Sequence, residues 1–238
     1  MLKLSERLNK QIQPYSLLEH PFYQAWQNGN LTLDDLRVYA KEYYSLESNF
    51  PRFLSRVHSN VDQPEVRKEI LKNVVSEELD GKSHRELWLD FAKSLGVSEN
   101  EMIEHVPMKK TQEAVATFME LASSANWKTG VAALYAYEQQ QPSVARTKRE
   151  GLVSFYGFDP QSEGLNFFKT HEVADQWHSE AEVSVLEKNL HPTEALEIEN
   201  AAYTAAKALW KFLDGISDQI GLENRESCSL SNRTCSLN

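Results

Sequence analysis

The sequence predicts an all-α protein, and three observations lead to that prediction. Only nine of the 238 residues are glycine, runs of β-branched residues are scarce, and apolar side chains recur at helical spacing. No segment shows the alternating pattern of a half-buried strand, and no internal repeat is visible. A chain of this length can bury a substantial core within one large domain.

The first well-marked helix begins after Thr32. Asp35 follows three residues later, where an acid suits the first turn of a helix that starts at a threonine cap. Helical spacing continues to about residue 50, and Pro51 then stops or restarts the helix. Pro64 stands at the first position of the next helix, which extends to residue 79. The apolar stripe expected on that helix consists of Val66, Ile70, Val74 and Val75.

A glycine separates this helix from the next one. Gly81 precedes SHRELWLDFAKSL, and Gly96 fits the position just beyond a helix end. After Gly215 the sequence becomes polar and rich in serine and asparagine. We therefore expect one helical domain over residues 1–215 and a flexible polar tail over 216–238. The other helices expected within the domain span residues 111–123, 127–141, 143–156, 171–189 and 193–215.

Composition narrows the classes of function. A formal net charge of −10 disfavours nucleic acid and anionic lipid as partners. The apolar runs are too short to cross a membrane, and the N-terminal segment lacks the apolar core of a signal peptide. The two cysteines, Cys228 and Cys235, do not form a C-x-x-C pair. These features predict a reduced, cytoplasmic protein.

The motif HEVADQWH, residues 171–178, places three metal-binding residue types on one side of a helix. His171, Asp175 and His178 follow the spacing i, i+4, i+7, which puts them within an arc of about 60 degrees. This stripe is either one wall of a metal site or a solvated surface face. Glu182 lies on the same side and would extend the stripe if it is an exposed face.

Two further segments carry acids or imidazoles in apolar surroundings. Glu77 and His84 are seven residues apart, and a helix break at Gly81 would let their side chains converge. Glu138 ends a stretch without charge, where an ionised carboxylate is costly unless it is paired or bound to a metal. Together with the stripe, these residues supply three carboxylates and three imidazoles, a set that suits two divalent ions such as iron or manganese.

Spacing alone leaves open the alternative that these residues are solvated surface groups and not a metal site. The chain does not follow the Glu-x-x-His signature of ferritin-like bundles, and an isolated pair such as Glu77 and His84 is usually solvated. Glu78 is a neighbour that could replace Glu77, although by default it faces solvent. The remaining histidines are expected to be structural or surface residues: His20, His58, His105 and His191.

Five separated blocks resemble, in order and spacing, the CADD-like para-aminobenzoate synthases, which are relatives of the haem-oxygenase-like di-metal oxidases and, more distantly, of PqqC and TenA proteins. The blocks are LLEHPFYQAW, VYAKEYYSLESNFPRFLSRVHS, NVVSEELDGKSHRELW, GVAALYAYEQQQPSVARTKREG and THEVADQWH. The resemblance implies a single-domain, seven-helix bundle with a dinuclear iron or manganese–iron centre and no haem. The metal ligands that it implies are the six residues isolated above, Glu77, His84, Glu138, His171, Asp175 and His178.

The resemblance also implies an unusual reaction. Para-aminobenzoate for folate synthesis would be made with O2 and an external reductant from a tyrosine of the protein itself. That tyrosine matches Tyr23, and the lysine that supplies the amino nitrogen matches Lys148, so each chain would work once. Tyr39 and Tyr137 match family tyrosines near the metals that relay electrons or are modified.

One position departs from the family pattern. Phe167 stands shortly before the first histidine of the stripe, where a family tyrosine is expected. A phenol is oxidised readily beside a metal centre, and a phenyl ring is not. Either that tyrosine is dispensable, or the radical takes another route in this chain.

Three other functions stay open at this point. A conventional oxygenase on the same scaffold would act on an external small molecule, and Tyr23 and Lys148 would then be replaceable. A death-domain-binding adaptor would not need the metal ligands. A cofactorless binder of the PqqC or TenA type would not need all six. The partners expected are O2 and an electron donor, and the resemblance leaves a homodimer open.

Overall fold

Helices form all the secondary structure in the part of the chain that the computed structural model describes, residues 2–223 and 225. This confirms the all-α prediction. Twelve α-helices occur there: α1 (Leu4–Ile12), α2 (Pro21–Gln27), α3 (Leu33–Glu47), α4 (Phe50–Asn60), α5 (Pro64–Leu79), α6 (His84–Ser94), α7 (Glu99–Ile103), α8 (Lys109–Ala122), α9 (Trp127–Glu138), α10 (Gln141–Phe155), α11 (Asn166–Asn189) and α12 (Ala195–Ile220).

The number of separate helices exceeds the seven expected because prolines and glycines divide the longer ones. Pro51 occupies the first turn of α4, directly after α3 has ended. Gly81, with φ of 78°, separates α5 from α6. Pro142 lies in the first turn of α10, three residues after Gln139 has closed α9. These breaks change helix direction and leave the fold class unchanged.

The expected helix boundaries are largely confirmed. The hydroxyl of Thr32 accepts a hydrogen bond from the amide of Asp35, and the Asp35 carboxylate accepts one from the amide of Thr32. Such reciprocal capping fixes the start of α3. Pro64 is the first residue of α5, and Gly96 takes a positive φ of 81° beyond α6.

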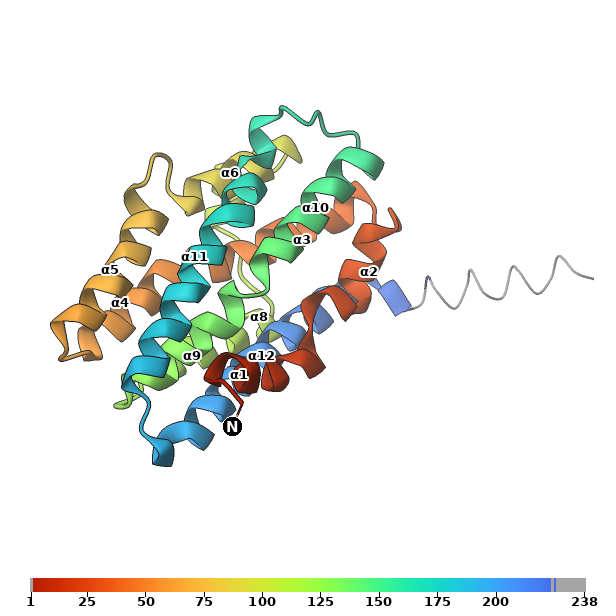
Figure 1. Cartoon of the computed structure of the whole chain (residues 1–238). Coiled ribbons are helices and arrows are strands. Elements are labelled where there is room, and N and C mark those ends of the chain that lie inside the picture. The colour runs from red at the N-terminus through yellow and green to blue at the C-terminus, as the bar shows by residue number, and fades with distance from the viewer. Residues whose placement is uncertain (1, 224, 226–238) are drawn as a thin grey trace, which may run out of the picture.

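Helix α9 lies at the centre of the fold and packs against α8, α11 and α12. Nearly all of its side chains are buried, so it belongs to the class of helices that are enclosed on every side. In Figure 1, α10 and α11 run beside each other in green and cyan, and α4 and α5 form a second pair at the left. Glu138 is thus delivered into the interior at the end of the central helix.

Two expectations about helices were wrong. Val75 is 43% exposed, and the inward face of α5 instead carries Asn73, Ser76 and Glu77 beside Val66 and Ile70. Burying polar groups costs free energy unless they are paired, so apolar packing alone does not account for the inward face of α5.

The second wrong expectation concerns the end of the last helix. Helix α12 passes the expected limit at residue 215 and continues to Ile220, because Ile216 and Ser217 are still buried. Gly215 lies inside the helix, where a Cβ would meet the Lys110 side chain at 3.0 Å. Gly221, with φ of 64°, ends the helix instead. The two cysteines and the rest of the predicted tail from residue 226 lie outside the described residues. Over the described range, no helix is long and apolar enough to cross a bilayer.

Candidate metal centre and its tyrosine–lysine cluster

The stripe on α11 faces the interior. His171, Asp175 and His178 are all buried, so the alternative of a solvated face is wrong for this helix. The opposite side of α11 reaches solvent, with Val173 exposed and Trp177 partly exposed. The stripe therefore forms one wall of an internal site.

Glu77 and His84 converge from two helices, as the break at Gly81 predicted. Glu77 ends the inward face of α5, and His84 is the first residue of α6. Their Oε2 and Nδ1 atoms lie 2.8 Å apart, and neither atom has a hydrogen-bond partner of good geometry. Glu78, the neighbour considered as an alternative, is exposed.

Glu138 joins the site from the end of α9. The side-chain amide of Asn73 donates hydrogen bonds to both of its carboxylate oxygens, at 2.9 and 3.2 Å. Nδ1 of His178 lies 3.1 Å from Glu138 Oε1 and 3.3 Å from Asp175 Oδ1. The structure thus brings together all six residues that the sequence singled out.

Two groups of ligand atoms form where these helices meet. Within each group, one nitrogen or oxygen atom from every residue lies within 4.8 Å of the others. The first group consists of Glu77, Glu138, Asp175 and His178, and the second consists of Glu47, His84 and His171.

Sequence reasoning missed Glu47. It ends α3 and has no histidine near it in the chain, so it resembled an ordinary acid at a helix end. The available signal was its spacing from Tyr39 and Tyr43, eight and four residues earlier, which places it on the same inward face. Glu182, considered as an extension of a solvated stripe, is also buried, beside Glu138.

The electrostatics of the site favour a bound cation. Burial raises the pKa of Glu47 and of Glu77 well above the usual range, and nearby carboxylates raise both further. Burial also raises the pKa of Asp175, to about 7. His178 offers a partial counter-charge, because, against the effect of burial, hydrogen bonds to Asp175 and Glu138 raise its pKa to about 10. One imidazolium cannot balance four buried carboxylates, and the remaining acids are costly unless they are neutralised. Several of the atoms lack a hydrogen-bond partner: Glu47 Oε1, Glu77 Oε2, His84 Nδ1, Asp175 Oδ2 and His178 Nε2.

The donor set fits a metal. Imidazole nitrogens and carboxylate oxygens, without thiolates, are the ligands that divalent iron and manganese accept. The two groups adjoin through the 2.8 Å contact between Glu77 and His84, and within the second group the ring centres of His84 and His171 are 4.4 Å apart. These buried clusters could therefore hold metal ions.

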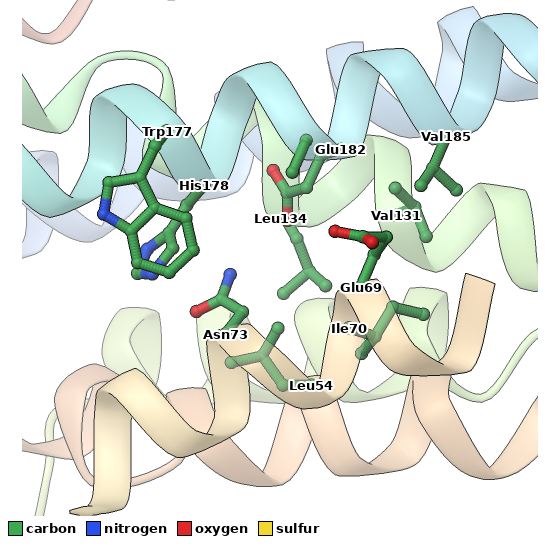
Figure 2. A pocket seen from close by; sticks show the side chains of 11 residues that line it. Leu54, Glu69, Ile70, Asn73, Val131, Leu134, Trp177, His178, Glu182 and Val185 are labelled. Carbon is green, nitrogen blue, oxygen red and sulfur yellow. The ribbon is translucent and has the colours of Figure 1, made fainter. Parts of the chain in front are cut away.

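A small apolar pocket reaches the first group from the protein surface (Figure 2). Its free volume is about 20 Å³, which is room for roughly one water-sized molecule. Glu69 and Trp177 stand at positions that are partly exposed, whereas His178, Asn73 and Glu182 line the buried part. Its apolar lining consists of Leu54, Ile70, Val131, Leu134, Ala181 and Val185.

A second cluster surrounds Lys148 on α10. Lys148 is only 1% exposed, although its sequence neighbours Arg146 and Arg149 are basic. Of its basic neighbours, Arg146 is exposed and Arg149 pairs with Glu172 on α11. Its Nζ atom instead lies 5.1, 5.0 and 4.8 Å from the ring centres of Tyr23, Tyr39 and Tyr43.

The tyrosines form a continuous chain between the lysine and the metal-binding groups. The hydroxyls of Tyr23 and Tyr39 are 2.9 Å apart. The rings of Tyr39 and Tyr43 are stacked, with centres 5.5 Å apart, and the hydroxyls of Tyr43 and Tyr137 are 2.5 Å apart. The sequence pointed to three of these residues and missed Tyr43, whose place in the chain depends on tertiary packing.

Burial sets the protonation of this cluster. It lowers the pKa of Lys148 to about 7, although the charge of Glu47 opposes the shift. It raises the pKa of Tyr23, and it raises those of Tyr39, Tyr43 and Tyr137 well above the usual value. The lysine amine is therefore available as a neutral nucleophile near neutral pH, beside phenols that keep their protons.

Phe167 occupies the position where the resemblance leads one to expect a tyrosine. Its ring lies against the imidazole of His171, with ring centres 4.0 Å apart, and meets Tyr43 edge-on at 6.2 Å. A hydroxyl-free ring at this place supports the histidine by packing alone, while the nearest phenol of the chain just described is supplied by Tyr43.

Comparisons with known proteins agree with this architecture. Two structures share the fold at low identity: a protein with a heme oxygenase-like fold from Shewanella denitrificans (TM-score 0.80, 16% identity, 94% and 96% of the two chains) and a CADD-like protein from Nostoc punctiforme (TM-score 0.75, 17% identity, 91% and 96%).

Two curated relatives are closer in sequence. A 4-aminobenzoate synthase of Nitrosomonas europaea is 38% identical over 224 residues, which cover 90% of each chain. One of Chlamydia muridarum is 39% identical over 209 residues, or 88% of each chain. The resemblance read from the five sequence blocks is confirmed. Because the family model described as TENA/THI-4/PQQC matches residues 9–219, the chain belongs to the TENA/THI-4/PQQC family.

Proposed function

We propose that this chain is an O2-dependent enzyme that makes 4-aminobenzoate from its own side chains. The observation that carries the proposal is the position of Lys148, a buried amine surrounded by three tyrosine rings and next to two groups of metal-binding atoms. The relatives named 4-aminobenzoate synthase support the product. In this proposal Tyr23 supplies the ring and Lys148 supplies the amino nitrogen.

The atoms of a tyrosine side chain account for the carbon skeleton of the product. Tyrosine carries a methylene group para to its ring oxygen, and 4-aminobenzoate carries a carboxyl carbon para to its ring nitrogen. The bond between Cα and Cβ of Tyr23 and the bond between Cε and Nζ of Lys148 would both break. Cβ would be oxidised to the carboxyl carbon with oxygen from O2 or water, and the Lys148 nitrogen would replace the phenol oxygen, which leaves as water. O2 is the oxidant and an external donor supplies electrons.

Lys148 is suited to form a carbon–nitrogen bond because burial lowers its pKa to about 7, so a substantial part of its amine is neutral at that pH. Its helix is held in place by Trp26, whose indole N–H donates to the Lys148 carbonyl oxygen at 3.1 Å. The aromatic rings around Nζ exclude water, which protects reactive species formed on the ring from hydrolysis.

The two groups of ligand atoms would hold a dinuclear centre, Fe/Fe or Mn/Fe, without haem. When bound, such a centre supplies the oxidising power of O2. The chain of Tyr137, Tyr43 and Tyr39 connects the metal-binding region with Tyr23 through two hydrogen-bonding contacts and one stacked pair. Within the pairs Tyr23–Tyr39 and Tyr43–Tyr137, one phenol can pass an electron together with its proton to the neighbouring hydroxyl, whereas the stacked rings of Tyr39 and Tyr43 would pass the electron alone.

The size of the pocket favours a substrate that is already part of the protein. Its free volume of about 20 Å³ admits a diatomic molecule but not an aromatic ring. An oxygenase acting on an external small molecule on the same scaffold would need more room beside His178 and Glu182.

The test is isotope tracing through a single turnover. Protein labelled with ¹⁵N at lysine side chains and ¹³C at tyrosine rings would be reduced, loaded with iron and manganese, and exposed to O2. We expect labelled 4-aminobenzoate, at no more than one molecule per chain, together with loss of mass from the peptides that contain Tyr23 and Lys148. Unlabelled product that continues to accumulate would instead identify an external substrate.

A matched pair of control residues lies on α12. Lys207 Nζ sits 5.6 Å from the ring centre of Tyr203, at the protein surface. Tyr23→Phe and Lys148→Arg should each abolish the product, whereas Tyr203→Phe and Lys207→Arg should leave its yield unchanged. Equal losses in all four variants would indicate a general effect on folding.

A further inference from the structure

We propose that Glu47 is a seventh metal ligand, which completes the position formed by His84 and His171. This inference rests on the metal centre of the proposed function and adds a ligand to the six that the family resemblance implies. Helix α3, which carries Glu47, contributes none of those six; they come from α5, α6, α9 and α11.

The two groups of ligand atoms are unequal without Glu47. Glu77, Glu138, Asp175 and His178 provide four donors that lie within 4.8 Å of one another. Without Glu47, the other group consists of two imidazoles alone. Metal sites with open positions generally retain three protein ligands, and manganese and iron favour oxygen donors. The Glu47 carboxylate supplies the missing third donor, and it supplies an oxygen.

The burial of Glu47 needs an explanation that other contacts do not provide. The residue is 2% exposed, and its Oε1 atom has no hydrogen-bond partner. Among the described residues, no lysine or arginine lies within ion-pair distance of it, although Lys148 is close enough to feel its charge. An unpaired buried carboxylate is costly, and coordination of a cation removes that cost.

A second buried glutamate on the same helix has hydrogen-bond partners for its carboxylate, unlike Glu47. Glu42 is 1% exposed, and its carboxylate accepts hydrogen bonds from the hydroxyl of Thr111 and the amide of Met108. The imidazole of His105 lies 2.5 Å from the same carboxylate. Hydrogen bonds within the protein therefore account for the burial of the Glu42 carboxylate, and they do not account for that of Glu47.

The location of Glu47 gives this ligand a particular place in the site. Its charge acts on His84 and Asp175 on one side and on Lys148, Tyr43 and Tyr137 on the other. Glu47 is thus the carboxylate at the boundary between the metal-binding atoms and the tyrosine–lysine cluster.

The test measures metal binding in the absence of O2. Wild type, Glu47→Gln and the matched control Glu42→Gln would be titrated with Mn(II), and bound metal would be counted by elemental analysis after gel filtration. We expect two equivalents for wild type and Glu42→Gln. Glu47→Gln should keep one tight equivalent and bind the second at least tenfold more weakly, while circular dichroism shows that it is folded. Two equivalents of unchanged affinity in folded Glu47→Gln would overturn the proposal.

A second measurement needs no variant. Crystals of the wild-type protein soaked with Mn(II) should show an anomalous peak within bonding distance of Glu47, His84 and His171, and a peak that excludes Glu47 would overturn the assignment. The outcomes separate this inference from the proposed function. If product forms but the manganese ion lies away from Glu47, only the assignment of Glu47 as a ligand is contradicted. If two ions bind, one of them at Glu47, and no product forms, only the proposed function is contradicted.

Discussion

The Nζ atom of Lys148 lies 4.8 Å from the ring centre of Tyr43, a residue more than one hundred positions earlier in the chain. The contact joins α10 to α3 in the interior, where the lysine is 1% exposed and forms no ion pair with any of the described residues. The chemistry proposed for this protein depends on that contact, because a solvated lysine would be protonated and unreactive at neutral pH.

The first prediction concerns the pH dependence of product formation. Burial lowers the pKa of Lys148 to about 7, so the neutral amine predominates above that pH and the ammonium below it. The single-turnover rate of 4-aminobenzoate formation should therefore fall roughly tenfold for each pH unit below about 6. Rapid-quench measurements between pH 5 and 8.5 would check this. A rate that is flat across that range would show that deprotonation of Lys148 does not limit the reaction.

The same pKa predicts how stability varies with pH. The folded pKa of about 7 lies below the ordinary lysine value of 10.5, so between these values the unfolded chain binds more protons and stability rises with pH. Below pH 7 the full penalty of burying the charge is present. Lys148→Met should therefore be more stable than wild type at pH 6, by on the order of a few kcal/mol, with a smaller difference at pH 9. Urea unfolding at both pH values gives the comparison, and Lys207→Met, at the surface, should show no such pH-dependent difference.

Metal binding should stabilise the folded protein strongly. The site gathers buried carboxylates with unsatisfied oxygen atoms, and a ligand that binds only the folded state adds about 2.7 kcal/mol at a concentration one hundred times its Kd. We expect chelation to lower Tm by several degrees and Mn(II) to restore it, as followed by circular dichroism. Glu77→Gln should show a smaller response to Mn(II). An equal response in that variant would place the stabilising ion elsewhere.

Tyr43 should be required for efficient turnover, although the sequence did not single it out. Tyr43→Phe removes the 2.5 Å contact with the Tyr137 hydroxyl while keeping the ring that packs against Tyr39. We expect the yield of 4-aminobenzoate per chain to fall roughly tenfold, because the tyrosine chain is interrupted, while metal binding stays unchanged. Tyr44→Phe is the control, since the Tyr44 hydroxyl accepts a hydrogen bond from Arg85 instead. An unchanged yield in Tyr43→Phe would mean that the reaction does not use this path.

A stability prediction concerns the close approach of α10 to α2. A Cβ on Gly151 would lie 2.7 Å from Cδ1 and 2.9 Å from Nε1 of Trp26, whose indole N–H donates to the Lys148 carbonyl. Gly151→Ala should therefore destabilise the protein by about 1–3 kcal/mol, the usual cost of overpacking. Ser154→Ala, at an exposed position of the same helix, should lie within about 0.5 kcal/mol of wild type in urea unfolding. A neutral Gly151→Ala would show that Trp26 can move aside.

Local sequence signals determined the helices and most of the site. The Thr32–Asp35 cap, Pro64 and Gly96 act on neighbouring residues only, so their effects could be predicted from the sequence without knowing the fold. The six ligands anticipated for the metal centre were visible because each belongs to a spacing within one segment or follows a run without charge. The extension of α12 to Ile220 was not visible, because the burial of Ile216 depends on other helices.

The sequence by itself therefore established an all-α chain, the boundaries of several of its longer helices, and six of the residues that meet in the interior. The tertiary structure decided which polar groups share one space. Glu47 becomes a candidate ligand only when α3 packs against α6 and its carboxylate comes close to His84 and to His171 of α11. Tyr43 joins the tyrosine chain only when it meets Tyr137 on α9. Lys148, whose neighbours in sequence are basic, becomes a neutral amine because three tyrosine rings from other helices replace its water. Desolvation and long-range contact are properties of packed helices, and the spacing of residues within one helix does not encode them.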